Sequence, residues 1–291
     1  MHFASAKGIL SANNTMNIFR GCSHGCIYCD SRSACYHIDH AFEDIEVKEN
    51  ALELLEDALR RRRTKGMIHT GSMCDPYIHA ETALNYTRRS LEIIEKYGFG
   101  VTVLTKSDRI LRDIDLYDRI NRKTKAVVQF TLTTMDPDVC KMIEPNVSGT
   151  QSRIEALKAF RDRNIPTVVW LCPILPFIND TEANIRGIVD ACADAGVKGI
   201  ITFGMGLTLR EGNREYFYQQ LDKRFPGMKQ KYVRHFGNSY ECPSPYEGAL
   251  MTLFKSRCAQ HGILSDRDAL FAYLHTFETE AVQLSLFDRL S

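Results

Sequence analysis

Three closely spaced cysteines near the start of the chain are the residues best suited to chemistry. Cys22, Cys26 and Cys29 stand in the run GCSHGCIYCD, with the spacing CxxxCxxC. This spacing brings three thiolates close enough to hold three irons of a four-iron, four-sulfur cluster. Because such clusters usually take four cysteine ligands, three cysteines leave one iron open. An open coordination position is what distinguishes a catalytic metal centre from a structural one.

Two other uses of these cysteines are weaker alternatives. A zinc site would need a fourth ligand, and the nearby candidates are His24, Cys35 and His37. Zinc ribbons, however, usually show paired CxxC knuckles, and the sequence has no second pair. Buried structural cysteines are common, but they do not explain this spacing beside Gly21 and Gly25, which allow a loop to wrap closely round a cluster.

The composition is that of an ordinary globular protein. The chain has 291 residues, 44% of them hydrophobic and 25% charged, and a formal net charge of +1. Such a charge argues against a protein that coats nucleic acid, but permits a local basic groove. Ten cysteines, without a signal peptide, predict a cytoplasmic location. Since no stretch approaches ~20 apolar residues, no membrane span is expected.

Short apolar runs alternate with amphipathic segments between residue 17 and about residue 205. The expected strands are 17–19, 67–71, 101–105, 126–132, 167–172 and 198–204. The expected helices are 47–63, 81–97, 109–122, 137–143, 151–164 and 181–195. Strands separated by helices of this length imply right-handed crossovers and a parallel sheet. We therefore predict an α/β fold, a partial (β/α)6 TIM-type barrel over residues 1–205, with chemistry at the carboxyl ends of its strands.

The pattern changes after residue 205. Segments 213–224, 245–261 and 266–281 are expected to be helical. We predict a C-terminal helical extension over residues 206–280 that closes one side of the barrel, followed by a tail over residues 281–291.

The cysteine motif resembles that of the radical S-adenosylmethionine (SAM) superfamily. The resemblance implies that the open iron of a [4Fe–4S] cluster binds the amino and carboxylate groups of SAM. An electron from the cluster would then cleave SAM into methionine and a 5′-deoxyadenosyl radical, which takes a hydrogen atom from a substrate. It also implies that Tyr28 packs against the adenine of SAM. The loop after the second strand would bind the methionyl amino group, and Gly71 and Ser72 suit that role.

Further strings resemble the spore photoproduct lyase family and its bacterial relatives. They are NIFRGCSHGCIYCDSRS, CDPY, TKS, RDID, EP and CPILP, which together cover residues 17 to about 205. These lyases reverse a methylene-linked thymine dimer in DNA, so the resemblance implies lesion repair. The chain departs from the family in two ways: only 21 residues precede Cys22, and the C-terminal region does not reproduce the lesion-binding part.

The lyase resemblance implies roles for four more residues. Lys106 would pair with the carboxylate of SAM, and Thr131 and Arg153 would join the SAM-binding set. Cys74 would return a hydrogen atom to the product radical, and Tyr28 is a candidate relay. The alternatives are a surface lysine in a turn for Lys106, an ordinary β-branched strand residue for Thr131, and a buried small residue for Cys74.

Two segments outside the barrel suggest contact with DNA. The tail contains a peptide resembling the one by which bacterial DNA polymerases and repair proteins dock on the sliding clamp: Gln283, Leu284, Ser285, Leu286 and Phe287. The alternative is a helix end that packs its leucines on the core. Residues 228–246 interleave cations with aromatic rings, which suits either phosphate contact and base stacking or an amphipathic helix packed on the barrel.

The sequence thus predicts a cytoplasmic radical SAM enzyme that repairs DNA. Its cofactors would be a [4Fe–4S] cluster and SAM, and its partners damaged DNA, the sliding clamp and a reductant such as flavodoxin or ferredoxin. One alternative is a radical SAM enzyme that acts on RNA, a peptide or a metabolite. Another is a clamp-bound iron–sulfur redox sensor.

Overall fold

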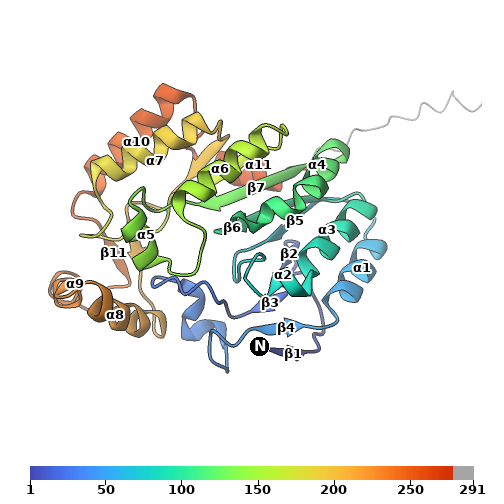
Figure 1. Cartoon of the computed structure of the whole chain (residues 1–291), viewed down its shortest axis with the longest axis horizontal. Helices are drawn as coiled ribbons and strands as arrows, with labels where there is room; N and C mark the ends of the chain where they lie inside the picture. The colour runs from blue at the N-terminus through green and yellow to red at the C-terminus, as the bar shows by residue number, and fades with distance from the viewer. Residues whose placement is uncertain (278–291) are drawn as a thin grey trace, which may run out of the picture.

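A sheet of six parallel strands forms the centre of the computed structural model, which describes residues 1–277 (Figure 1). In spatial order the strands are β2 (Thr15–Met16), β5 (Met67–Thr70), β6 (Gly100–Thr105), β7 (Ala126–Thr131), β8 (Thr167–Trp170) and β9 (Gly199–Ile201). Every neighbouring pair runs in parallel. This order confirms the predicted α/β partial barrel, in which consecutive strands lie side by side.

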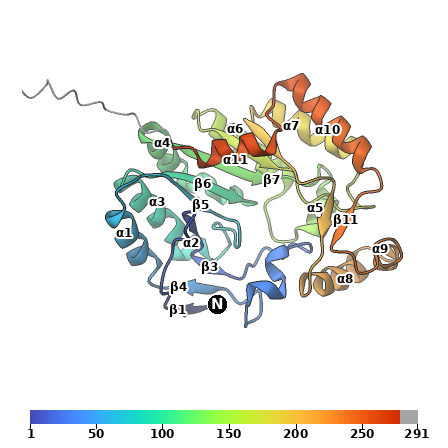
Figure 2. The same cartoon turned by 180° about the vertical axis from the view of Figure 1, so that it is seen from behind.

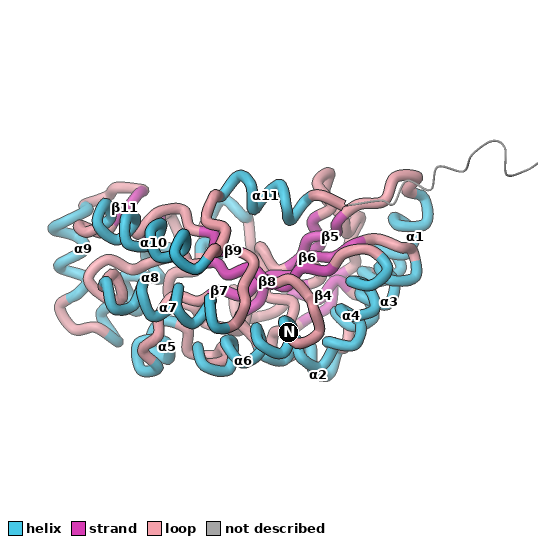
Figure 3. Tube along the Cα trace, turned by 90° about the horizontal axis from the view of Figure 1, so that it is seen from above, coloured by secondary structure: helices cyan, strands magenta, loops and turns pink. Residues whose placement is uncertain are grey.

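Helices connect these strands and cover the sheet. They are α1 (Ala51–Arg61), α2 (Glu81–Leu84), α3 (Tyr86–Lys96), α4 (Ile114–Lys123), α5 (Pro137–Ile143), α6 (Thr150–Arg161) and α7 (Glu182–Asp194). Short 3₁₀ segments occupy Asp30–Arg32, Ala34–Tyr36 and Asp108–Asp113. Helices α3, α4, α6 and α7 lie along one face of the sheet, and the C-terminal helix α11 (Arg267–His275) lies on the other (Figure 3).

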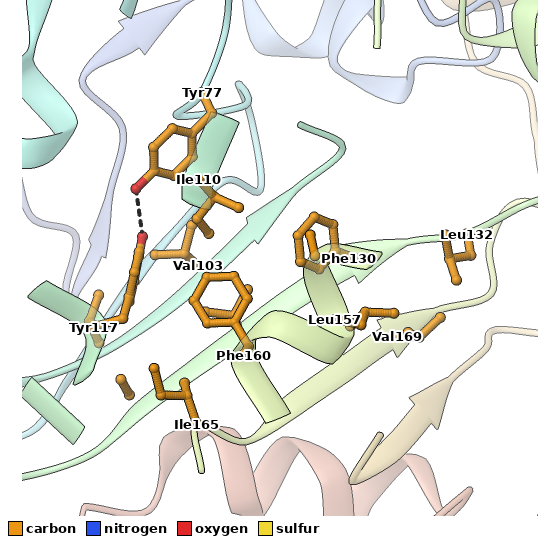
Figure 4. Close-up of a cluster of buried hydrophobic side chains, with 14 of the residues drawn as sticks. Tyr77, Val103, Ile110, Tyr117, Phe130, Leu132, Leu157, Phe160, Ile165 and Val169 are labelled. Carbon is orange, nitrogen blue, oxygen red and sulfur yellow. Dashed lines mark hydrogen bonds between the residues drawn. The ribbon is translucent and has the colours of Figure 1, made fainter. Parts of the chain in front are cut away.

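Alternate strand residues pack on opposite faces. Val128 and Val169 belong to the large hydrophobic cluster that includes Phe160 of α6, and Figure 4 shows Val169 in this cluster with Phe130, Leu157 and Phe160. Val127 and Val168, one residue earlier on the same strands, pack against α11. Because both faces are covered, the strands are mostly apolar on both faces, and polar residues among them, such as Gln129 and Thr102, are buried and hydrogen-bonded to each other.

A second, three-stranded sheet lies at the N-terminal edge. It has the order β1 (His2–Ala4), β4 (Glu46–Lys48) and β3 (Phe19–Arg20), with β1 and β4 parallel and β3 antiparallel to β4. The sequence did not predict β1, and it placed the last two residues of β4, Val47 and Lys48, inside helix 47–63. The first barrel strand lies at residues 15–16 instead of 17–19.

Two other predicted helices are interrupted. The expected helix 81–97 breaks at Asn85, whose φ of +58° is left-handed and ends α2 before α3 begins. The expected helix 109–122 starts as a 3₁₀ segment and becomes α-helical only at Ile114.

The C-terminal part adds helices and a small ribbon to the barrel. It contains β10 (Gly206–Thr208), α8 (Asn213–Arg224), α9 (Met228–Phe236), β11 (Glu241–Pro243) and α10 (Glu247–His261), ahead of α11. Strands β10 and β11 pair antiparallel, a ribbon that the sequence did not predict. Helices α8 and α9 lie at the opposite end of the molecule from α1 (Figures 1 and 2). Within residues 1–277, no helix is long and apolar enough to cross a membrane.

Candidate active site

The cysteine loop is shaped by tight backbone contacts. Gly21 has a φ of +80°, and a Cβ atom there would lie 2.5 Å from the carbonyl oxygen of Phe42. Only glycine fits such a position without strain. The backbone N–H of the next residue, Cys22, donates to that same carbonyl at 2.9 Å. The loop therefore enters the cysteine motif in a conformation that the sequence imposes.

The three motif cysteines lie together below the surface. Cys22 and Cys26 are buried and Cys29 is half-buried. Burial raises the pKa of the Cys26 and Cys29 thiols, and the negative charge of Cys22 raises both further. The pKa of Cys22 is lowered to about 6, chiefly by a hydrogen bond with the thiol of Cys74. Because thiolates bind iron, loading this site releases protons, and three thiols at one buried place fit three irons of a cluster.

The other nearby candidates for a fourth ligand divide into two groups. Cys35 and His37 are exposed, so they do not join the buried thiols. His24 is buried, with Nδ1 3.3 Å from the Asp75 carboxylate, and its Nε2 has no hydrogen-bond partner among the described residues. His24 thus belongs to the framework that holds the cysteine loop on the strand ends.

Asp75 connects the loop after β5 to the end of β6. Its carboxylate accepts hydrogen bonds from the Thr105 hydroxyl at 2.7 Å and from the Lys106 backbone N–H at 2.7 Å. It also accepts from the backbone N–H of Tyr77 at 2.8 Å, the local turn that an aspartate before proline favours. With His24 as a further contact, Asp75 fixes three loops relative to one another, a role that sequence alone did not assign.

A buried ion pair between Glu144 and Arg153 anchors the hydroxyl of Tyr28. The Tyr28 hydroxyl donates to a carboxylate oxygen of Glu144, whose other oxygen accepts from the Arg153 guanidinium at 2.6 Å. Arg153 also donates to the backbone carbonyl of Thr131 at 2.6 Å. Both members of the pair have no exposed side-chain surface. Since the hydroxyl of Tyr28 is anchored in this way, its ring is held in one orientation.

The segment after Glu144 holds the cysteine loop from a second side. The Asn146 side chain donates to the Ser23 carbonyl at 2.9 Å, and its backbone N–H donates to the His24 carbonyl at 3.1 Å. A Cβ atom at Gly25 would lie 3.2 Å from Pro145. The EP pair of the sequence is therefore structural support for the cysteine loop.

Lys106 supplies a cation near this group. Its ammonium nitrogen lies 5.9 Å from the centre of the Tyr28 ring. Burial lowers the pKa of Lys106, but the charges of Cys26, Glu144 and Asp75 more than offset it and leave the pKa raised. Lys106 is therefore charged at neutral pH and is placed to bind an anionic group beside Tyr28.

A cavity of about 660 Å³ opens next to the cysteine loop. Its inner wall includes Cys26, Tyr28, Cys29 and Ser72. Its volume is within the range of about 300–1,000 Å³ that ligand pockets occupy. A cofactor held at the cysteines therefore has space on the side where Tyr28 and Ser72 lie.

Aromatic side chains form the outer wall of this cavity. They are Trp170 at the end of β8, Phe203 after β9 and Tyr240 before β11. Phe203 and Tyr240 are 56% and 45% exposed, unusual for large hydrophobic residues of this chain. Cys172 and Cys242 lie on the same wall. Of these five residues, the sequence singled out only Tyr240, as part of segment 228–246, although Cys172 stands at the carboxyl end of a predicted strand, where chemistry was expected.

Five of the predicted site residues do not line the cavity in the described part of the chain: Cys22, Cys74, Lys106, Thr131 and Arg153. Cys74 is buried beside Cys22, so its role as hydrogen donor stays a prediction. Thr131 holds Arg153 through its backbone carbonyl. Arg153 contacts Glu144, which accepts from the Tyr28 hydroxyl, so its place in the SAM-binding set stays a prediction.

The aromatic segment 228–246 is largely structural. Tyr232 is fully buried, and Phe236 packs on it with ring centres 5.4 Å apart. Lys229 forms an ion pair with Asp222 at 2.7 Å. The interpretation of α9 as an amphipathic helix therefore holds, and only the end of the segment, with the exposed Tyr240, reaches the cavity.

Two curated proteins of similar sequence are both described as uncharacterized. One, from Mycobacterium tuberculosis, is 26% identical over 258 residues, which cover 87% of this chain and 75% of that protein. The other, from Methanocaldococcus jannaschii, is 32% identical over 176 residues, which cover 60% of this chain and 65% of that protein.

Solved structures with the same fold include radical SAM enzymes. A spore photoproduct lyase variant with bound AdoMet and dinucleoside spore photoproduct matches with a TM-score of 0.63 and 14% identity, covering 85% of this chain and 74% of that one. The radical SAM methyltransferase TsrM from Kitasatospora setae matches with a TM-score of 0.56 and 15% identity, covering 82% and 51%. At these identities the likeness concerns the fold.

The family model of the radical SAM superfamily matches residues 16–186, more than half of the chain. That span contains the three cysteines and four of the six barrel strands in full, β5 to β8. Superfamily membership implies a [4Fe–4S] cluster and SAM as cofactors, and the buried thiols beside a cavity with Tyr28 and Lys106 fit both. The chain belongs to the radical SAM superfamily.

Proposed function

We propose that this radical SAM enzyme is a lyase that repairs a thymine lesion in DNA, similar to spore photoproduct lyase. The observation that carries the proposal is the cavity, which joins the cluster cysteines on its inner wall to three aromatic side chains on its outer wall. When bound, the cluster and SAM supply a 5′-deoxyadenosyl radical that takes a hydrogen atom from the substrate. The chain's own residues must hold the cofactors, seat the substrate and return a hydrogen atom.

The inner wall and two residues next to it, Cys22 and Lys106, have the groups that SAM requires. In this proposal Cys22, Cys26 and Cys29 hold the cluster and leave one iron for SAM. The Tyr28 ring, fixed through its hydroxyl, packs on adenine. Lys106 pairs with the carboxylate of SAM. Ser72 accepts from the amino group, because a serine hydroxyl offers acceptor lone pairs to an ammonium.

The outer wall suits a flat base next to a phosphate. The Trp170 indole N–H donates to the Gln129 side chain at 2.7 Å, which fixes the ring in place. The Arg210 guanidinium lies 5.3 Å from the Tyr240 ring, and that of Arg267 lies 5.9 Å from the Phe203 ring. Exposed rings next to cations are the usual means of binding unpaired nucleotides. A lesion in a duplex must leave the base stack to reach this wall.

Two thiols compete for the role of hydrogen donor. Cys74 is the residue that the sequence predicts, and Cys172 lies on the cavity wall. Burial raises the pKa of Cys172 to about 12, and the pKa of Cys74 is also well above its usual value because of its hydrogen bond to Cys22 and its burial. Both thiols therefore keep the S–H bond that hydrogen donation needs. If Cys74 is the donor, Cys74→Ala gives abnormal products and Cys172→Ala does not; the reverse result assigns the role to Cys172.

The experiment that tests the proposal is anaerobic turnover with a defined lesion. The reconstituted protein, SAM and a reductant are incubated with dinucleoside spore photoproduct or with the undamaged dinucleotide, and Cys26→Ala is the control without a complete cluster. We expect lesion-dependent 5′-deoxyadenosine and loss of the lesion in the wild type only. Equal 5′-deoxyadenosine with and without lesion would contradict a DNA substrate and favour RNA, a peptide or a metabolite. No 5′-deoxyadenosine in any case would favour a redox sensor.

We also propose that the tail docks on the sliding clamp and that a flavodoxin or ferredoxin reduces the cluster. Gln283–Phe287 lies outside the described residues, so this proposal depends on the sequence alone. Clamp binding by the full chain should disappear in a Leu286→Ala/Phe287→Ala variant, and unchanged binding would contradict the docking motif.

A further inference from the structure

Two histidines and a glutamate meet at the N-terminal edge of the fold, away from the cavity. His2 begins β1 and pairs in register with Glu46, the first residue of β4. His40 comes from the loop before β4. One ligand atom from each of the three residues lies within 4.8 Å of the others. The His2 Nε2 atom is 3.9 Å from a Glu46 carboxylate oxygen, and the two imidazole rings are 4.9 Å apart at their centres.

The Nδ1 atom of each imidazole lies within hydrogen-bond distance of an acceptor. Nδ1 of His2 lies 2.9 Å from a carboxylate oxygen of Asp44, which also accepts from the Met1 amino group. Nδ1 of His40 lies 3.0 Å from the Ala41 carbonyl oxygen. Since ionised carboxylates and carbonyls only accept hydrogen bonds, both Nδ1 atoms carry the hydrogen. In the neutral rings both Nε2 atoms then present a lone pair.

One of these lone pairs, that of His40, meets no donor among the described residues. His40 Nε2 is buried and has no hydrogen-bond partner among residues 1–277. Buried polar atoms without partners are rare, and a bound ion is one recognised reason for them. An imidazole whose second nitrogen donates to a carboxylate or carbonyl is also the usual arrangement of a metal-binding histidine.

We propose that His2, His40 and Glu46 bind a divalent transition-metal ion, with Zn²⁺ as the preferred occupant and a water in the fourth position. Two imidazoles and a carboxylate are ligands that zinc accepts. Ligand atoms about 2.0–2.1 Å from a tetrahedral zinc lie about 3.4 Å from one another. The separations of 3.9 Å and up to 4.8 Å reach that value by small side-chain rotations.

The ion would brace the cysteine loop without taking part in its chemistry. The site joins β1 and β4 to the loop that carries Phe42, and the Phe42 carbonyl accepts from the backbone N–H of Cys22. Figure 2 shows β1 and β4 side by side at the N-terminal edge. Binding there fixes the support on which the cysteine motif begins, so the ion is structural and separate from the cluster.

The test is zinc binding by protein whose cluster is already filled. After anaerobic reconstitution with iron and sulfide, Zn²⁺ is added, and zinc and iron are measured together with the zinc X-ray absorption spectrum. We expect about one zinc per chain in addition to the cluster iron, with nitrogen and oxygen ligands at about 2.0–2.1 Å and no sulfur at about 2.3 Å. Sulfur ligation would overturn the assignment, because the zinc would then be at cysteines.

Variants separate the site from adventitious binding. Glu46→Gln and His40→Ala should lose stoichiometric zinc, and Asp44→Asn should bind about 10–100-fold more weakly, the usual effect of removing a partner of a metal-binding histidine. His261→Ala is the matched control, because His261 lies 3.3 Å from the Asp190 carboxylate and belongs to no such histidine pair. Equal zinc affinity in Glu46→Gln and His261→Ala would overturn the proposal.

Thermal unfolding checks that the variants are folded. Zinc should raise the melting temperature of the wild type and of His261→Ala, because a ligand that binds only the folded state stabilises it. The isosteric Glu46→Gln variant should melt near the zinc-free wild type and show no rise with zinc. A rise equal to that of the wild type would contradict a role for Glu46.

Discussion

Replacing Arg153 with methionine tests the support beneath Tyr28. The change leaves the Glu144 carboxylate buried without its 2.6 Å partner, and both side chains have no exposed surface. Removing one member of a buried pair costs about 3–5 kcal/mol, because the remaining charge is desolvated and unpaired. The Thr131 carbonyl also loses a donor at 2.6 Å, which adds about 1 kcal/mol. We expect a loss of about 4–6 kcal/mol in the free energy of unfolding.

A double variant separates stability from cofactor binding. Arg153→Met with Glu144→Leu removes both charges, and apolar replacement of a buried pair is often neutral. The double variant should therefore regain most of the lost stability. The hydroxyl of Tyr28 would still lack its acceptor, so SAM should bind more weakly than in the wild type.

The assays are urea unfolding followed by circular dichroism and anaerobic equilibrium dialysis with SAM. A loss below about 1 kcal/mol for Arg153→Met, the range of an exposed ion pair, would refute the reasoning. So would a double variant as unstable as the sum of two single changes, or one that binds SAM as tightly as the wild type.

Three further predictions concern the sheet and the cavity. Gly71→Ala should lower the free energy of unfolding by about 2–4 kcal/mol, because Gly71 has a φ of +100° and a Cβ would collide with a carbonyl of β6. The control Gly98→Ala, at a φ of +66° with open space around it, should lower it by about 1 kcal/mol. Equal urea midpoints for the two variants would contradict this. Burial and a neighbouring histidine lower the pKa of His69 from 6.5 to about 4. Between these values the unfolded state binds more protons than the folded state, so stability falls as the pH drops from about 6.5 towards 4. His69→Gln should therefore lose less free energy of unfolding than the wild type between pH 7 and pH 5. Trp170→Ala should raise the KM for a lesion substrate and leave SAM affinity unchanged, and a parallel loss of both would place Trp170 with the cofactor.

The sequence predicted the barrel well because its strands are buried on both faces. Runs such as 126–132 are apolar apart from Gln129 and Thr131, and each is followed by a helix of sufficient length for a crossover. The ribbon of β10 and β11 was missed because each strand has three residues and the partners are separated by more than thirty residues. No local periodicity signals such a pair, although it forms part of the cavity wall.

The cysteine motif was predictable because its spacing alone defines it. The directions of side chains in loops were not predictable, because no spacing encodes them. The loop after β5 places Ser72 on the cavity wall and Cys74 beside Cys22. Which of two residues faces a cavity depends on the turn around Asp75, whose contacts come from residues far along the chain. Arg153 was likewise singled out by resemblance, but only the fold shows its contact with Glu144.

Electron paramagnetic resonance of the reduced, reconstituted protein tests most directly whether SAM binds an iron that has no protein ligand. The account predicts a [4Fe–4S] signal that changes when SAM is added, and no such signal in Cys29→Ala. A signal that SAM leaves unaltered, or a purified protein that holds zinc at the three cysteines, would contradict it.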